Sequence, residues 1–158
     1  MSSAARDRFV DEMATALNQA GLPRLPSRVF SALLSDDDGR MTSAELAEAL
    51  GISAAGVSGA VTYLARVNMI RRETVPGGRR HVYVVDDDAW HDTMVNNTRL
   101  YAPMTDALDR AIGRIPADAP ERHRLELTRE FLLFVTREMQ MLAERWERHK
   151  RTLLRDRD

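Results

Sequence analysis

The sequence predicts a mainly α-helical fold that carries one small β-hairpin. Apolar residues recur at spacings of three and four along most of the 158 residues, which is the helical period. Only one region differs: two β-prone runs, 70–75 and 81–85, lie on either side of Pro76-Gly77-Gly78, and this order is typical of a hairpin. A hydrophobic content of 44% is enough for the core of one domain.

The first two helices are expected at about 4–20 and about 27–34. The first has an amphipathic stripe that includes Phe9 and Met13, and it ends at Gly21, a residue that readily adopts a left-handed conformation. The second carries its own apolar residues and leads into an acidic loop at 36–38. Both helices therefore precede the part of the chain with the most specific pattern.

Two short capped helices come next, at about 43–50 and about 54–68. Thr42 can cap the first, since Glu45 stands at the capping-box spacing, and Ser53 can cap the second. The second helix has an inward stripe made of Val57, Val61 and Leu64. A helix, a tight turn through Gly51, a second helix and a basic hairpin together predict a winged helix-turn-helix domain.

Two helical regions are expected after the hairpin. The first starts near Asp88, where an acidic run suits a helix N-terminus, and Pro103 must kink or split it before it ends near Ile112. The second, about 121–155, is the longest and carries a heptad-like apolar seam. A second apolar row lies beside that seam and consists of Leu127, Phe131, Phe134 and Met141. Two rows predict two packing partners.

The long terminal helix therefore predicts a homodimer, with one row on the home domain and one across the two-fold axis. We expect residues 1–26 to contribute to dimerisation, 27–87 to form the winged domain and 88–158 to form a helical dimerisation region. The residues expected to form the dimer contacts are Phe9, Met13, Leu132, Val135, Met139, Leu142 and Trp146.

Positive charge is concentrated where such a domain would meet DNA. The chain has a net charge of -1, yet residues 53–81 contain five arginines (Arg66, Arg71, Arg72, Arg79 and Arg80) and one acid, Glu73. DNA affinity depends on clustered positive charge rather than on the sum. Double-stranded DNA is the expected partner.

The second helix of the motif is expected in the major groove, with its N-terminal half toward the bases. Its outward face has many small residues, so specificity is expected to depend on DNA shape and on Arg79 or Arg80 in the minor groove. The candidate DNA-binding residues are Thr42, Ser53, Ala54, Ala55, Ser58, Gly59, Thr62, Tyr63, Arg66, Arg72, Arg79 and Arg80.

The stretch from Ser43 to Ser53, followed by Val57-Ser58, Leu64, Ile70-Arg71-Arg72 and a Gly-Arg-Arg wing, resembles the MarR family of transcriptional regulators. The wing leads through an aromatic strand into Asp86-Asp87-Asp88-Ala89-Trp90, which is similar to the GbsR-like branch. The resemblance implies an obligate dimer on a palindromic operator, a repressor more often than an activator, and control by a small-molecule effector.

Other classes of function are less well supported. A winged domain can also bind proteins without binding DNA, and a salt-dependent gel shift separates these two readings. An enzyme is not expected, because there are no cysteines and the four histidines form no tight metal-binding pair. Asp87, Asp88, His91 and Asp92 could form a metal cluster, but helix capping explains the acids more simply, and no cofactor is expected.

Three further expectations concern location, membranes and ligands. No stretch has the length of a signal peptide core or a membrane span, so a cytoplasmic protein is expected, and the evenly mixed charges of the last helix do not suit a membrane anchor. A ligand pocket could be lined by Trp90, Met94, Tyr101 and Met104, although ordinary core packing explains these residues as well. His149 lies on the seam, where a buried or interfacial histidine is more usual than a sensor.

Overall fold

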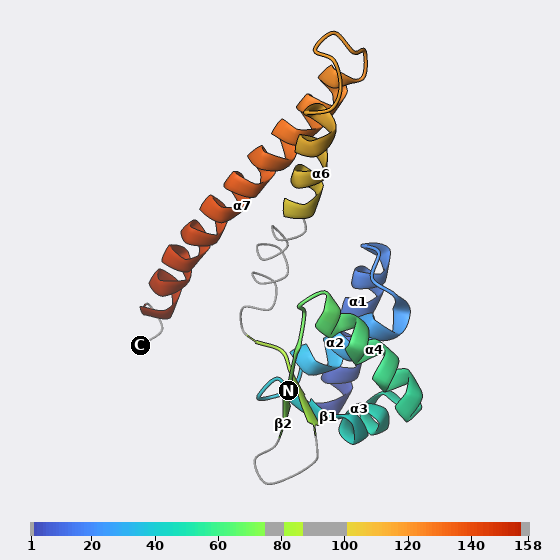
Figure 1. Ribbon diagram of the computed structural model, residues 1–158. Helices are drawn as coiled ribbons and strands as arrows, with labels where there is room; N and C mark the ends of the chain where they lie inside the picture. Colours follow the sequence, from blue (N-terminus) through green and yellow to red (C-terminus); the bar gives the residue numbers. More distant parts are fainter. Residues whose placement is uncertain (1, 75–80, 87–100, 156–158) are drawn as a thin grey trace. The chain divides into compact units, whose positions relative to one another are not determined.

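The computed structural model describes residues 2–74, 81–86 and 101–155. The chain divides into two compact units, residues 1–90 and residues 91–158 (Figure 1). The first unit, here called the winged unit, contains four helices and three strands in the described residues; the second, the helical unit, contains two helices. The mainly helical fold with a small sheet agrees with the sequence prediction.

The winged unit begins with α1 (Ser3–Gln19) and α2 (Arg24–Leu34), which pack against each other. The expected start of α2 at residue 27 is three residues too late, because a proline such as Pro26 is also typical of the loop before a helix. Pro26 instead lies in the first turn of α2. A proline is tolerated there, since the N–H that it lacks would have no partner within the helix.

The sheet has three strands, one more than the predicted hairpin. Its order is β1 (Arg40–Thr42), β3 (His81–Val84), β2 (Arg71–Thr74), and both pairings are antiparallel. The sequence prediction missed β1 because three residues are too few to show alternation. Gly39 precedes β1 at φ 66°, and a Cβ there would lie 2.9 Å from the carbonyl oxygen of Val85, so this approach requires glycine.

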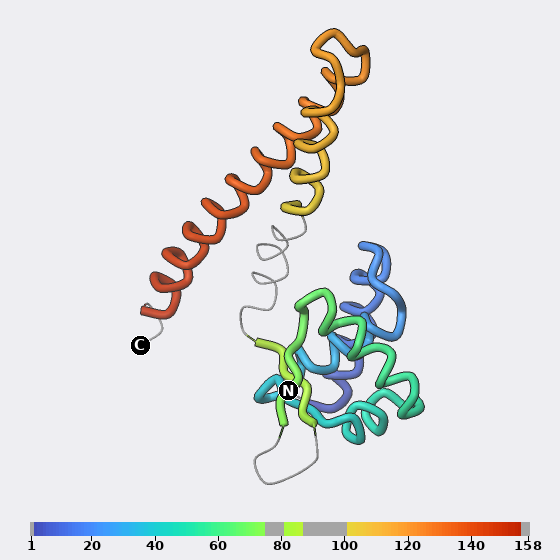
Figure 2. Tube along the Cα trace, viewed as in Figure 1, coloured from blue at the N-terminus to red at the C-terminus, as the bar shows by residue number. Residues whose placement is uncertain are grey.

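The core of the winged unit surrounds α2, which contacts α1, α3 (Ser43–Leu50) and α4 (Ala54–Arg66) (Figure 2). Its largest fully buried side chains include Phe30, Leu33, Leu46 and Leu64. Among the described residues, every buried hydrophobic side chain lies between Val10 and Val85. The packed core therefore holds the two helices of the motif and the sheet as one body.

The helical unit consists of α6 (Ala102–Ile112) packed against α7 (Arg122–Arg155). Pro103 lies in the first turn of α6, a position at which a proline is tolerated. The part of the predicted helix at 88–100 lies outside the described residues. Arg122 Nη1 donates to the carbonyl oxygens of Ile112 (3.3 Å) and Ile115 (3.2 Å), and these bonds fasten the connection to the start of α7.

Candidate nucleic-acid interface

The helix-turn-helix is built from local hydrogen bonds that the sequence specifies. Glu45 N–H donates to Thr42 Oγ1 (3.3 Å) and Thr42 N–H donates to Glu45 Oε2 (2.6 Å), which confirms the capping box of α3. Gly51 adopts the left-handed conformation at φ 61°, and Ile52 N–H then donates to the Ala47 carbonyl. These contacts turn the chain sharply into α4.

Helix α4 presents one buried and one exposed face. Val57, Ala60, Val61 and Leu64 point into the core, as the spacing predicted, and Asn68 ends the helix region at φ 59°. The opposite face carries the exposed members of the predicted reading set, which are Ser53, Ala54, Ala55, Ser58, Gly59, Thr62 and Arg66. A Cβ added at Gly59 would meet nothing within 4 Å. The exposed face of α4 therefore carries mostly small side chains, so another molecule can approach the helix closely.

The hydroxyl groups in the predicted set differ in what they can offer a ligand. Ser53 Oγ accepts a hydrogen bond from Gly56 N–H (3.2 Å). A hydroxyl that accepts in this way can still donate a hydrogen bond to a phosphate oxygen. Thr62 Oγ1 donates to the Ser58 carbonyl (2.8 Å) and keeps only acceptor capacity. Thr42 Oγ1 donates to Glu45 Oε2 (2.8 Å) and also accepts a bond, so its hydroxyl serves the helix cap.

Tyr63 and Arg66 form a pair at the C-terminal half of α4. Tyr63 is half-buried and packs against the core, so less of its side chain is available than the sequence prediction assumed. The Arg66 guanidinium carbon lies 5.3 Å from the centre of the Tyr63 ring, a cation–π distance. The stacking leaves the guanidinium at the surface, where it can meet a phosphate.

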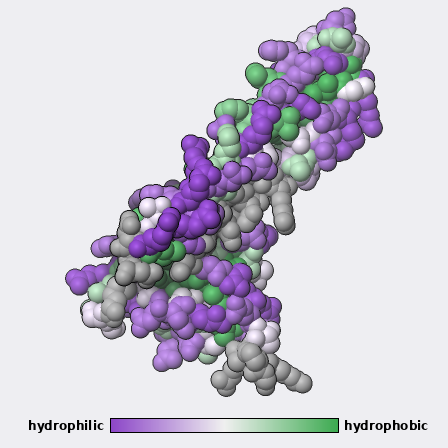
Figure 3. All heavy atoms as spheres, turned by 90° about the vertical axis from the view of Figure 1, so that its left-hand side faces the viewer, coloured by the Kyte–Doolittle hydropathy of each residue, from purple (hydrophilic) through white to green (hydrophobic). Residues whose placement is uncertain are grey.

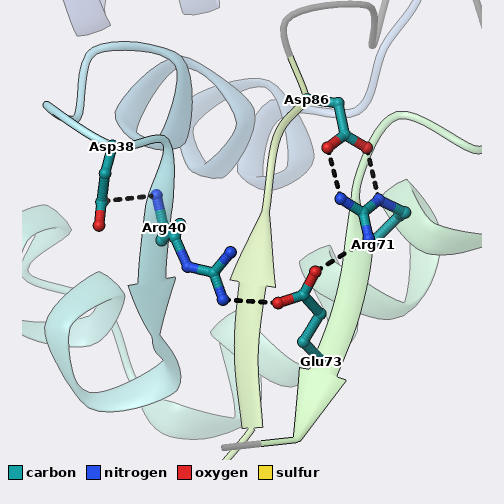
Figure 4. A network of polar contacts seen from close by, with 5 residues as sticks. All are labelled: Asp38, Arg40, Arg71, Glu73 and Asp86. Atoms are coloured by element: carbon teal, nitrogen blue, oxygen red, sulfur yellow. Dashed lines mark hydrogen bonds and ion pairs between the residues drawn. The ribbon is translucent and has the colours of Figure 1, made fainter.

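The wing strands carry an exposed DNA-binding candidate, Arg72, and a network of ion pairs that the sequence did not predict. Arg72 is exposed on β2, and no carboxylate pairs with it in the part of the chain that the structure describes. Arg79 and Arg80 lie outside the described residues. Figure 4 shows the missed network, in which Arg40, Glu73, Arg71 and Asp86 follow one another across the sheet.

The contacts of this ionic network are short and partly bidentate. Arg40 Nη2 donates to Glu73 Oε2 (2.5 Å), and Arg71 Nη1 donates to Glu73 Oε1 (2.9 Å). Arg71 also donates from Nε and Nη2 to the two oxygens of Asp86, at 2.5 Å each. Asp86 is the first residue of the acidic run that was expected to suit a helix N-terminus, and its carboxylate pairs with Arg71.

Hydrogen bonds in the network shift the acid–base equilibria of its members. The bond from Arg40 lowers the pKa of Glu73, and the two bonds from Arg71 lower the pKa of Asp86. The same pairing with Asp86 raises the pKa of Arg71 above its ordinary value. Nearby, the side-chain bond with Asp36 raises the pKa of Asp38. The carboxylates of Glu73 and Asp86 therefore keep their charge to a lower pH than they would without these bonds.

Apolar side chains remain at the surface of the helical unit (Figure 3). The second row of α7 is the most exposed, with Leu127 and Phe131 at 62%, Phe134 at 53% and Met141 at 46%. Of the predicted dimer residues, Leu132, Val135 and Met139 are half-buried in the chain, and Leu142 and Trp146 are exposed. Phe9 and Met13 of α1 are half-buried against the core of the winged unit.

The remaining predicted sites receive less support from the described residues. Trp90 and Met94 lie outside them, Tyr101 is half-buried and Met104 is exposed. The suggested metal ligands Asp87, Asp88, His91 and Asp92 also lie outside, and the described part contains no group of three residues placed to hold a metal. The rings of His149 and Trp146 lie 6.0 Å apart between centres and are tilted by 49°. No described helix has the length and apolar character needed to cross a membrane.

The fold and this surface together define a winged helix-turn-helix protein. The family model for the MarR family matches residues 20–81, and that for an MmpR5-like MarR family transcriptional regulator matches residues 88–149. HTH-type transcriptional regulator MmpR5 from Mycobacterium tuberculosis is 32% identical over 131 residues, which is 80% of this chain and 78% of the relative. The chain belongs to the MarR family of transcriptional regulators.

A solved structure supports the same assignment. The crystal structure of a transcriptional regulator superposes on this chain with a TM-score of 0.77, and the two sequences are 28% identical. The match covers 91% of this chain and 99% of that regulator. The protein is thus a DNA-binding regulator and not an enzyme.

Proposed function

We propose that this regulator binds a palindromic operator as a homodimer and represses transcription. The observation that carries the proposal is the exposed face of α4, which has Ser53 and Ser58 near its N-terminal end and Arg66 at its C-terminal end. The N-terminal half of such a helix faces base edges, while a distal arginine suits the phosphate backbone. Fold and charge distribution both support DNA as the partner.

Within this interface, α4 can approach the DNA closely, but it has few side chains that can distinguish one base from another. Ala54, Ala55 and Gly59 offer no side chain long enough for a bidentate contact with a base, so few positions discriminate directly. We assign the remaining discrimination to DNA shape and to the wing, where Arg72 contacts phosphate and Arg79 or Arg80 enters the minor groove. A protein-interaction role without DNA would leave the concentration of arginine between residues 53 and 81 unexplained.

The homodimer is supported by the exposed row of α7. Phe131 and Phe134 are aromatic and more than half exposed in the single chain, and exposed apolar rows of this kind mark interaction surfaces. We propose that this row and the seam from Leu132 to Trp146 pack against a second copy, with α1 contributing through residues 1–26. The two α4 helices would then sit about 34 Å apart, one turn of DNA.

Two finer features of the function stay predictions. Control by a small-molecule effector is proposed for a pocket that includes Trp90, Met94, Tyr101 and Met104, and the half-buried Tyr101 is the one described member that suits a pocket wall. Membership of a GbsR-like branch is proposed from the Gly-Arg-Arg wing and the acidic run before Trp90. Titration of the operator complex with candidate metabolites tests the effector.

The decisive experiment is selection of bound DNA from a random pool, followed by affinity measurements on the selected site across a range of salt concentrations. We expect a palindrome and an affinity that falls steeply as salt rises. Arg66→Ala and Arg72→Ala should each weaken binding and reduce the salt slope by about one. Enrichment of no sequence, together with binding insensitive to salt, would overturn the proposal in favour of a protein-interaction module.

A further inference from the structure

The ionic network occupies a specific position in the winged unit. Arg40 and Arg71 lie on the two outer strands, and each is directly opposite Val84 of the central strand β3 in the register of the sheet. Asp86 lies two residues beyond the end of β3, and Glu73 lies between the two arginines in the chain of contacts (Figure 4). The network therefore links the two outer strands, β1 and β2, to Asp86 beyond the end of β3.

By their charge alone, Glu73 and Asp86 should weaken the binding of DNA. Glu73 is the single acid within the basic region 53–81, and a carboxylate near a DNA-binding surface repels phosphate. The side chains of Glu73 and Asp86 are 32% and 35% exposed. Isolated ion pairs with this exposure contribute little to the stability of a protein. Neither DNA attraction nor global stability explains the arrangement.

Geometry offers a different explanation. The Arg71 fork meets both oxygens of Asp86, and a planar bidentate pair restricts orientation as well as distance. The pair ties the first residue of β2 to the segment that leaves β3, so the two strands resist splaying at that end. At the other end these strands lead into residues 75–80, which include Arg79 and Arg80.

The second half of the network connects the wing to the helix-turn-helix. Arg40 begins β1, which ends at Thr42, the capping residue of α3. Arg40 N–H donates to Asp38 Oδ1 (3.2 Å) and Asp36 Oδ2 (3.3 Å), while its guanidinium holds Glu73. The bond between Arg40 and Glu73 therefore links β2 to the strand that leads into α3.

We propose that Arg40, Glu73, Arg71 and Asp86 are positioning residues that hold the wing at the angle required for operator binding. The proposal rests on the proposed function, in which the wing contacts DNA. Glu73 and Asp86 then increase operator affinity, although both carry the charge that DNA repels. They do so by holding the wing arginines beside the groove that α4 occupies.

The test compares variants that remove one negative charge each. Asp86→Asn and Glu73→Gln act within the network, and Asp37→Asn is the matched control, since Asp37 is an exposed acid of the same unit that pairs with Arg6. We expect both network variants to bind the selected operator about fivefold more weakly, the effect of losing a surface network contact. The control should bind equally well or slightly more tightly.

A charge-conserving variant separates geometry from charge. Arg71→Lys keeps the positive charge but offers no planar fork, so we expect it to weaken operator binding as Asp86→Asn does. Asp86→Glu keeps the carboxylate and should retain most of the affinity. Non-specific binding to unrelated DNA should not fall in any of these variants, because it depends on the number of charges alone.

Hydrogen exchange of the β2 and β3 amides provides the structural readout. We expect faster exchange at 71–74 and 81–84 in Asp86→Asn, with unchanged protection in α2 and α4, which keep their core. Tighter operator binding by Asp86→Asn and Glu73→Gln would overturn the proposal. If Arg66→Ala and Arg72→Ala leave binding intact, it is the proposed function that fails.

Discussion

The two units of this protein differ in how completely they bury their own apolar surface. The winged unit encloses Phe30, Leu33 and Leu64 without help from elsewhere. In the described residues of the helical unit the one buried side chain is Thr105, whereas Phe131 and Phe134 stay largely exposed. The winged unit thus buries its own core, whereas the helical unit leaves an apolar row that we propose a second copy covers.

The largest effect is expected from the core of the winged unit. Leu64 is fully buried between α4 and the rest of the core, so Leu64→Ala should lower the free energy of unfolding by about 2–5 kcal/mol. Chemical denaturation at several protein concentrations measures this loss. If the winged unit is complete by itself, the loss in its transition should not depend on concentration.

The next effect concerns self-association of the helical unit. Phe131→Ala removes an aromatic side chain from both copies of the proposed interface, and we expect the dimer to dissociate at least about tenfold more readily. Sedimentation equilibrium measures the change, and Leu34→Ala, at an exposed leucine of α2, is the control. An unchanged dimer in Phe131→Ala, or a stable monomer of the natural chain at micromolar concentration, would contradict the comparison.

A smaller effect is expected at the cap of α4. Ser53→Ala removes the oxygen that accepts from Gly56 N–H, so the winged unit should lose about 1 kcal/mol of stability. Ser53→Asp keeps a capping acceptor and should restore stability while placing a negative charge beside DNA. Stability retained but operator binding lost in Ser53→Asp would separate the structural role of Ser53 from its proposed contact with phosphate.

The smallest effect is a pH dependence confined to the winged unit. The pKa values of Glu73 and Asp86 are lowered in the folded state by the bonds from Arg40 and Arg71. Their contribution to stability is therefore fully present above the unfolded values, about pH 4, and is lost as the pH falls through the lowered values. Asp38, whose pKa is raised, acts in the opposite direction.

Unfolding measured between neutral pH and pH 3 tests this dependence. The natural chain should lose more stability over this range than a Glu73→Gln, Asp86→Asn double variant. Equal losses in the two proteins would show that the ionic network does not contribute to the stability of the wing.

Prediction from sequence succeeded where the signal is local. The capping box of Thr42 and Glu45, the left-handed turn at Gly51 and the inward stripe of α4 all depend on residues within one or two turns of each other. It was wrong for the start of α2, because a proline is compatible with both the first turn of a helix and the loop before it.

The sequence by itself determined the class of domain, the position of its reading helix and the concentration of arginine between residues 53 and 81. Tertiary structure alone decided the third strand and the ionic network. Arg40, Glu73 and Asp86 meet only after β1 and β2 have paired with β3, and the partners in β1 and β3 are at least forty positions apart in the sequence. Cross-strand register depends on packing of the whole sheet against the helices, and no local pattern records it.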